Sequence, residues 1–330
     1  MHNGRIGTYR LFLLLLLVLN TISLYACTKD DGILVSYEFD RRALPDTVQV
    51  TLPILDWKES SGIIVSEYAP LNITHQSAAV YGDYAFFVTS GRSAIYLFNL
   101  RKKALLSTLS LKVQNSSIYH CNQSSFGPYK YDPSDPFPLL YVSQRTRSNQ
   151  RCFVEVFRIL PSYNEVLSDY DSFHVELVQL IYLPAMTSGN SLGNVNCVLD
   201  FASRSMYTYS RNNNQADDNY GICKISEFRI PDIYSKQVSL EDDDILSSFM
   251  LDISALYMQG GCINDGLLYI GQGDLSYGFT YLNVIDLEKE ALLTRIDLQE
   301  YGVRWEPEGC FFYDGSVMLS HKGAICRIDR

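Results

Sequence analysis

Two stretches near the end of the chain repeat one order of residue types. QGGCINDGLLYIGQG spans residues 259–273, and EPEGCFFYDGSVMLSHKG spans residues 306–323. Each places a Gly-Cys pair ahead of an apolar run, an Asp-Gly turn and a second apolar run. Asp-Gly between two such runs is a strong hairpin signal. A unit that recurs along one chain predicts a repeat architecture, here one built from small antiparallel sheets.

Further copies of the unit can be placed upstream. FNLRKKALLSTLSL (98–111) and IDLEKEALLTRIDL (285–298) both read as strand, charged turn and strand, with Ala-Leu-Leu in register. With the two strands ahead of each, the unit has four strands. Five copies predict an all-β fold, a five-bladed β-propeller.

The fifth copy lacks its outermost strand, so another segment has to cover the unpaired edge. TVQVTLPIL (47–55) is the candidate N-terminal strand that would close the last blade. The alternative is six blades, with residues 33–70 forming an irregular one.

The N-terminal region reads as a processing segment. Arg5 and Arg10 precede an apolar run that is too short to span a bilayer. The run leads to Leu-Tyr-Ala-Cys at 24–27, which looks like a lipobox, so Cys27 is the predicted lipidation site. The expected divisions are a signal peptide over 1–26, a tether over 27–45 and a single propeller domain over 46–330.

The predicted lipid anchor also indicates where in the cell the protein is located. Thr28-Lys29-Asp30-Asp31 resembles the surface-export signal of some Gram-negative lipoproteins, although a solvated charged linker explains it equally well. We expect an outer-membrane lipoprotein that is tethered through its lipid. Exposure at the cell surface is one of the two arrangements that this segment allows. Loss of Arg5 and Arg10 with the leader takes the net charge from −10 to −12. Such a chain is a poor partner for nucleic acid, which needs an excess of Lys and Arg.

Seven cysteines remain besides Cys27. Four of them are predicted on first strands (Cys121, Cys197, Cys262 and Cys310) and three on third strands (Cys152, Cys223 and Cys326). First and third strands of one sheet lie about 9–10 Å apart, whereas a disulfide needs Cα atoms within about 7 Å. We therefore expect buried thiols packed between blades, with no metal site and no cofactor.

The predicted propeller gathers polar residues at one end of its central channel. Loops that join one blade to the next, and those that join the second strand of a blade to the third, share one face. The candidate ligand-binding residues on this face are Gln76, Arg92, His120, Asn122, Arg145, Arg211, Gln259, Gln272, Glu306, Glu308 and His321. If the three arginines converge, they would suit a carboxylate or an acidic sugar.

A catalytic interpretation rests on the same residues. Glu306 and Glu308 are the one close acidic pair predicted at the channel mouth, and with His120 or His321 they would suit general acid–base chemistry. The simpler interpretation is that Glu308 caps the start of a strand while Pro307 stiffens the turn. The sequence has no nucleophile elbow, zinc-protease helix motif, dinucleotide loop or Walker loop.

Four stretches resemble a known group of propellers. HCNQSSFG (120–127), DPFPLLYVS (135–143) and the two Gly-Cys stretches are similar to five-bladed propellers of the helveticin J-like and phage receptor-binding-protein kind, and to surface lipoproteins built on that ring. The resemblance implies recognition at a cell surface and brings no catalytic residues with it.

The sequence therefore favours a non-catalytic recognition protein that binds a glycan, peptide or protein partner at the channel mouth. The alternative is a propeller enzyme, either a glycan lyase or hydrolase or a glutaminyl-cyclase-like protein, that uses Glu308 with a histidine. A third interpretation is a structural subunit of an outer-membrane complex.

Overall fold

The computed structural model describes the chain in seven segments: residues 62–89, 94–114, 120–144, 151–164, 169–184, 195–212 and 218–329. The chain divides into two compact units, Met1–Val48 with Pro161–Ser172 and Gln49–Leu160 with Phe173–Arg330. Of the first unit only two strand ends, 161–164 and 169–172, fall in the described segments. Apart from these ends, the sheets belong to the second unit.

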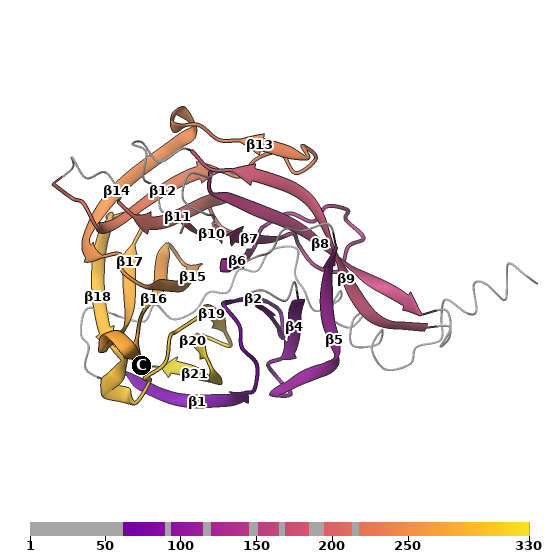
Figure 1. The fold of residues 1–330 in the computed structure, drawn as a ribbon, viewed down its shortest axis with the longest axis horizontal. Coiled ribbons are helices and arrows are strands. Elements are labelled where there is room, and N and C mark those ends of the chain that lie inside the picture. The colour runs from indigo at the N-terminus through magenta and orange to yellow at the C-terminus, as the bar shows by residue number, and fades with distance from the viewer. Residues whose placement is uncertain are drawn as a thin grey trace, which may run out of the picture. The chain divides into compact units, whose positions relative to one another are not determined.

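Five small antiparallel sheets are arranged as blades around a common centre (Figure 1). The first blade comprises β2 (Ser77–Tyr81), β3 (Tyr84–Val88), β4 (Ala94–Asn99) and β5 (Ala104–Gln114). The second comprises β6 (Cys121–Phe126), β7 (Leu140–Gln144), β8 (Phe153–Asn164) and β9 (Asp169–Tyr182). The third comprises β10 (Val195–Asp200), β11 (Ser205–Arg211), β12 (Ile222–Arg229) and β14 (Ile245–Ser254). The fourth comprises β15 (Met258–Asn264), β16 (Leu267–Asp274), β17 (Phe279–Asp286) and β18 (Ala291–Asp297).

The fifth blade is completed by a strand from the N-terminal side of the ring. β19 (Gly309–Tyr313), β20 (Ser316–His321) and β21 (Gly323–Asp329) supply three strands, and β1 (Ile64–Leu71) pairs antiparallel with β21. The chain is a five-bladed β-propeller. Closure by an N-terminal strand is confirmed, but the prediction that 47–55 supplies it is wrong. The outer edge of β21 is taken by β1, and 47–55 lies outside the described residues.

Helices contribute little to the described part of the chain. Three short 3₁₀ segments, η1 (Asp242–Asp244), η2 (Leu275–Tyr277) and η3 (Leu298–Tyr301), lie in connections between strands. None of the described helices has the length and apolar character needed to cross a bilayer. A further short strand, β13 (Gln237–Ser239), pairs in parallel with β9. The outermost strands of the first two blades, β5 and β9, also pair in parallel.

The innermost strands form a closed ring in which β2, β6, β10, β15 and β19 follow one another and β19 returns to β2. Glycine is needed where these backbones meet. A Cβ on Gly260 would lie 2.5 Å from the carbonyl oxygen of Glu308 and 2.6 Å from the Cα of Gly309. A Cβ on Gly309 would lie 2.7 Å from the Cβ of Ala78. Gly260, two residues before Cys262, and Gly309, directly before Cys310, therefore allow close contact between neighbouring blades.

Apolar side chains fill the space between neighbouring blades. The run YAFFV in β3 is buried at every position because both of its faces are covered. Ala85 and Phe87 pack with the fifth blade, whereas the ring of Phe86 lies 5.1 Å from that of Phe126 in the second blade. This double coverage explains why the sequence shows continuous apolar runs instead of alternation.

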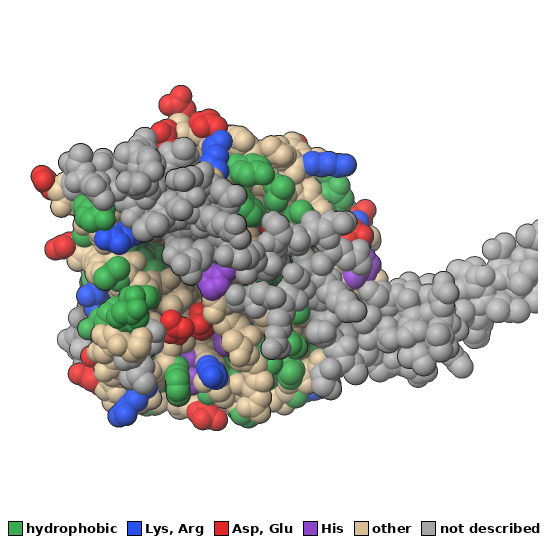
Figure 2. Space-filling model, viewed as in Figure 1, with side chains coloured by type: hydrophobic (Ala, Val, Ile, Leu, Met, Phe, Trp, Pro, Cys, Tyr) green, Lys and Arg blue, Asp and Glu red, His purple; other side chains and the backbone are tan. Residues whose placement is uncertain are grey.

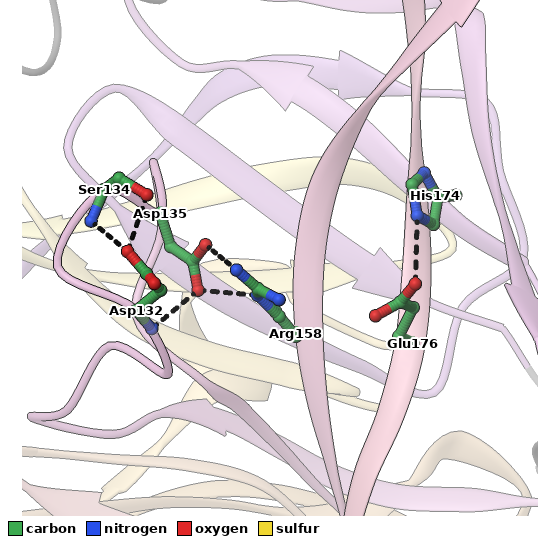
Figure 3. Close-up of polar contacts among 6 residues, drawn as sticks. All are labelled: Asp132, Ser134, Asp135, Arg158, His174 and Glu176. Carbon is green, nitrogen blue, oxygen red and sulfur yellow. Dashed lines mark hydrogen bonds and ion pairs between the residues drawn. The ribbon is translucent and has the colours of Figure 1, made fainter.

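The long connection at 129–138 joins β6 to β7, and an ion pair holds it to the blade (Figure 3). The guanidinium of Arg158 on β8 donates to both carboxylate oxygens of the buried Asp135, at 2.8 and 2.6 Å. The same carboxylate accepts from the backbone N–H of Asp132 at 3.0 Å. Because this hairpin connection joins the first and second strands, it lies on the face opposite the channel mouth. A bidentate pair of this kind fixes the loop firmly.

Replacement of Gly260 tests the close approach of the inner strands. We expect Gly260→Ala to lower the free energy of unfolding by about 3 kcal/mol, because the new methyl group meets backbone atoms that cannot move aside. Gly266→Ala is the control, since a Cβ at that residue would meet nothing within 4 Å and only its φ of +72° is unfavourable. Gly266→Ala should lower the free energy of unfolding by about 1 kcal/mol. Equal losses in urea unfolding would contradict the close-contact explanation.

Candidate functional site

The centre of the candidate site is a hydrogen bond between the first and fifth blades. Gln76 lies directly before β2, and its amide nitrogen donates to Glu308 Oε1 at 3.1 Å. Glu308 lies directly before β19 and is 8% exposed. Its backbone N–H donates to the carbonyl of Glu306 at 2.9 Å, across Pro307. The tight turn expected around Pro307 is therefore present, and it directs the Glu308 carboxylate toward the first blade.

A second amide–carboxylate contact lies beside the first. Gln259 on β15 donates from its amide nitrogen to Glu306 Oε1 at 3.4 Å. Its carbonyl oxygen accepts from the hydroxyl of Tyr209 at 2.6 Å, which secures the backbone of β15 against the third blade. Four of the predicted residues, Gln76, Gln259, Glu306 and Glu308, are thus brought together from the first, fourth and fifth blades.

Two histidines lie in the same region, and both are engaged by the protein. His75 is buried, and its Nε2 lies 2.8 Å from Ser320 Oγ on β20. His321 places Nδ1 3.0 Å from the carbonyl oxygen of Lys322 and Nε2 3.5 Å from Cys326 Sγ. Burial, assisted by the charge of nearby His321, lowers the pKa of His75 to about 4. His75 is therefore neutral at pH 7 and serves to join the first blade to the fifth.

The second blade contributes His120 and Asn122. His120 is half-buried and lies directly before β6. Asn122 sits on β6 at an irregularity in the pairing with β7. Its amide nitrogen is buried and has no hydrogen-bond partner among the described residues. A buried amide donor without a partner is costly, and Asn122 keeps its place as a candidate ligand contact.

Gln272 occupies a different environment from the other predicted residues. It is buried on β16, and its amide nitrogen donates to the carbonyls of Ser254 and Leu256, at 2.6 and 2.9 Å. Its side chain therefore holds the loop between the third and fourth blades. Its contact with a ligand stays a prediction.

Of the three arginines predicted at the mouth, only Arg211 lies in the described segments. Arg211 ends β11, and its guanidinium carbon lies 4.9 Å from the centre of the Tyr220 ring. Arg92 and Arg145 lie outside the described residues, as does the lipidation candidate Cys27. Convergence of the three arginines on an anionic ligand stays a prediction.

Gln123 is a residue of the ring centre that sequence reasoning missed. Its side chain is fully buried on β6, yet it reaches the fourth blade. The backbone N–H of Gly261 donates to Gln123 Oε1 at 3.1 Å, and Gln123 Nε2 donates to the carbonyl of Gly261. This paired contact links two blades that are not neighbours in the ring. The only available signal was its position two residues after the Cys of a first strand.

The cysteines lie where the repeat predicts, on first strands or at the third strands of the blades. All seven in the described segments are free thiols, and all but Cys262 are buried. Burial raises the pKa of Cys121 and of Cys223 to about 12, so both thiols are protonated at neutral pH. Cys262 and Cys310 belong to neighbouring blades, and their sulfur atoms lie 3.5 Å apart. Within the described segments, no group of three or more His, Cys, Asp or Glu side chains is arranged to hold a metal ion.

No family model and no curated protein matches this chain. Among solved structures, glutaminyl cyclase from Myxococcus xanthus covers 81% of this chain and 96% of its own, at 9% identity and a TM-score of 0.46. A luciferin-regenerating enzyme covers 79% and 73%, at 10% identity and a TM-score of 0.36. A nidogen/laminin complex covers 68% and 64%, at 10% identity and a TM-score of 0.36. Values this low support no inference about activity, and the helveticin J-like resemblance stays a prediction.

The buried His75 predicts an acid-sensitive step in stability. Its pKa is about 4 in the folded chain against an ordinary value of 6.5, so the unfolded chain binds more protons between these values. Stability from neutral His75 is present above the higher value and is lost as the pH falls toward the lower one. The variant His75→Gln keeps a donor for Ser320 but has no imidazole to protonate. When the pH falls from about 7 to about 4.5, we expect the free energy of unfolding to drop by about 2 kcal/mol less in this variant than in the wild type. Parallel pH profiles from chemical unfolding would contradict this assignment.

Proposed function

We propose that this chain is a lipid-anchored envelope protein whose propeller binds a ligand at the channel mouth without chemical conversion. The observation that carries the proposal is the Gln76–Glu308 hydrogen bond, with Gln259 and Glu306 beside it. Amides and carboxylates from three blades form a polar surface that no single blade could assemble. Such convergence of a few polar groups is typical of a binding site.

The contacts of His75 and His321 favour binding over acid–base catalysis by these two histidines. A catalytic carboxyl–imidazole pair needs an imidazole nitrogen that can exchange a proton with the substrate. The ring nitrogens of His321 lie against Lys322 O and Cys326 Sγ, and His75 is buried and neutral. The stretches similar to helveticin J-like and phage receptor-binding propellers agree with recognition at a surface.

Substitution at the mouth tests the proposal. We screen the purified mature chain against neutral and acidic glycans and against basic and acidic peptides. Gln76→Ala and Glu308→Gln should each weaken binding of the ligand found there by about tenfold, because the first removes an amide and the second removes the negative charge of a carboxylate at the mouth. Glu288→Gln, an exposed residue of the β17–β18 turn on the opposite face, is the charge-matched control. Unchanged binding in both mouth variants would remove the site, and turnover of a glycan that Glu308→Gln abolishes would favour the enzyme.

The anchor is tested separately from the ligand. We expect the chain expressed in a Gram-negative host to incorporate a labelled fatty acid and to fractionate with membranes, because several acyl chains bind a bilayer stably. Cys27→Ser should abolish both the label and the membrane fraction while leaving the propeller folded. Labelled Cys27→Ser protein would show that the lipid is attached elsewhere and would contradict the lipobox assignment.

A further inference from the structure

Exposed apolar side chains gather on the mouth face of the fourth blade. Leu256 is 45% exposed, Tyr257 36%, Tyr277 55% and Trp305 51%. They come from three connections that topology places on one face: the entry to β15, the β16–β17 turn and the exit from β18. On the face shown in Figure 2, hydrophobic side chains lie beside acidic ones near the centre. Clustered exposed aromatic residues mark binding surfaces more often than isolated ones do.

Two of these residues form a stacked pair, which we name the tyrosine platform. The ring centres of Tyr257 and Tyr277 lie 4.0 Å apart, and the ring planes are inclined by 27°. Both rings are partly open to solvent. The platform therefore presents electron-rich aromatic surface at a wet edge of the propeller.

The backbone of Tyr257 is held in a strained conformation. Its φ is +53°, which is unfavourable for a bulky aromatic residue. The other non-glycine residues with positive φ in the described segments occupy hairpin turns on the opposite face (Lys103, Arg204, Asp265, Glu290 and Asp314). Tyr257 alone among them lies on the mouth face. Strain of this kind persists where surrounding contacts impose it, and it is concentrated at functional sites.

A chain of hydrogen bonds imposes the conformation. The backbone N–H of Gly273 donates to the carbonyl of Tyr257 at 2.9 Å. Gln272 donates to the carbonyls of Ser254 and Leu256 on the same loop. Gln272 in turn accepts from Asn283 at 3.1 Å, and Asn283 accepts from Arg295 at 2.9 Å. The loop under the platform is thus fixed by side chains from β16, β17 and β18 before any ligand binds.

A carboxylate is linked to the strand that follows the platform. Gln259, two residues after Tyr257, donates to Glu306, and Glu306 follows Trp305 directly. Glu306 is half-buried, and none of the ion pairs found among the described residues includes it. Aromatic faces attract cations, and a carboxylate without a cationic partner adds to that attraction. A guanidinium suits both, because it is planar, stacks on aromatic rings and binds carboxylates.

We propose that the tyrosine platform and Glu306 form a subsite for the arginine side chain of a peptide ligand. The subsite rests on the proposed function, because it extends the mouth around Gln76 and Glu308 toward the fourth blade. The molecule already pairs arginine with tyrosine in this manner at Arg295 and Tyr281, whose guanidinium carbon lies 5.1 Å from the ring centre. The proposed subsite would offer the same combination to an arginine of the ligand.

Two matched probes test the subsite. Fluorescent Gly-Arg-Gly-Arg-Gly is compared with the same peptide carrying citrulline, which keeps the shape of arginine and loses its charge. By anisotropy at physiological ionic strength, we expect the arginine peptide to bind about tenfold more tightly. Tyr277→Ala and Glu306→Gln should each reduce this preference severalfold. Tyr257→Gly removes the other ring and suits the positive φ, so it should show the same loss with unchanged thermal stability.

Control variants separate the subsite from general attraction to an acidic protein. Tyr234→Ala removes an exposed tyrosine outside the platform, and Glu288→Gln removes a carboxylate on the opposite face; both should bind like the wild type. The subsite would be contradicted by equal affinity for the two peptides or by equal losses of binding in the control variants. It would also be contradicted if neutral maltohexaose bound in a platform-dependent way and the arginine peptide did not bind. Binding that depends on Gln76 and Glu308 but not on the arginine charge would contradict the arginine subsite and would still agree with the mouth as the binding site. Arginine-dependent binding that Gln76→Ala and Glu308→Gln do not affect would instead contradict the proposal that the mouth around these two residues binds the ligand.

Discussion

Backbone contact between the innermost strands is the constraint on which the rest of this propeller depends. Gly260 on β15 faces Glu308 and Gly309, and Gly309 in turn faces Ala78 on β2. A side chain at either glycine would push neighbouring blades apart where five strands converge. Because the ring is closed, such a displacement could not be absorbed by one blade alone. Gly260 and Gly309 are therefore packing requirements of the axis.

The same close approach determines where polar groups can meet. When β15 and β19 lie within backbone contact, Gln259 at the start of β15 and Glu308 directly before β19 are carried to one end of the ring. Gln76 enters from the first blade because β19 returns to β2. Gln123 spans the interior from the second blade to Gly261 and satisfies both polar groups of that residue's backbone. The mouth is thus built by the geometry of the axis, with its amides and carboxylates held by partners on other blades.

Two neighbouring surfaces of the mouth differ in how they are supported. Gln76 and Glu308 bind each other directly across a blade boundary. The tyrosine platform is supported from beneath, through Gln272, Asn283 and Arg295 within one blade. Both arrangements restrict side-chain motion, which would reduce the entropy lost on binding the proposed ligand. Gln272, whose contact with a ligand stays a prediction, supports the loop between the third and fourth blades.

The sequence by itself determined the all-β class and the placement of the cysteines on first and third strands, and it favoured five blades over six. It also placed Gln76, Gln259, Glu306 and Glu308 at one end, because strand order and turn positions are local properties. Only the tertiary structure decided that β1 closes the ring instead of 47–55. β1 is an edge strand that contains Pro70 and has half of its residues exposed, and such strands carry a weak pattern. Likewise, the reach of Gln123 and the stacking of Tyr257 on Tyr277 depend on backbone positions set by distant blades, and no local pattern encodes a contact between residues whose separation is fixed by ring closure.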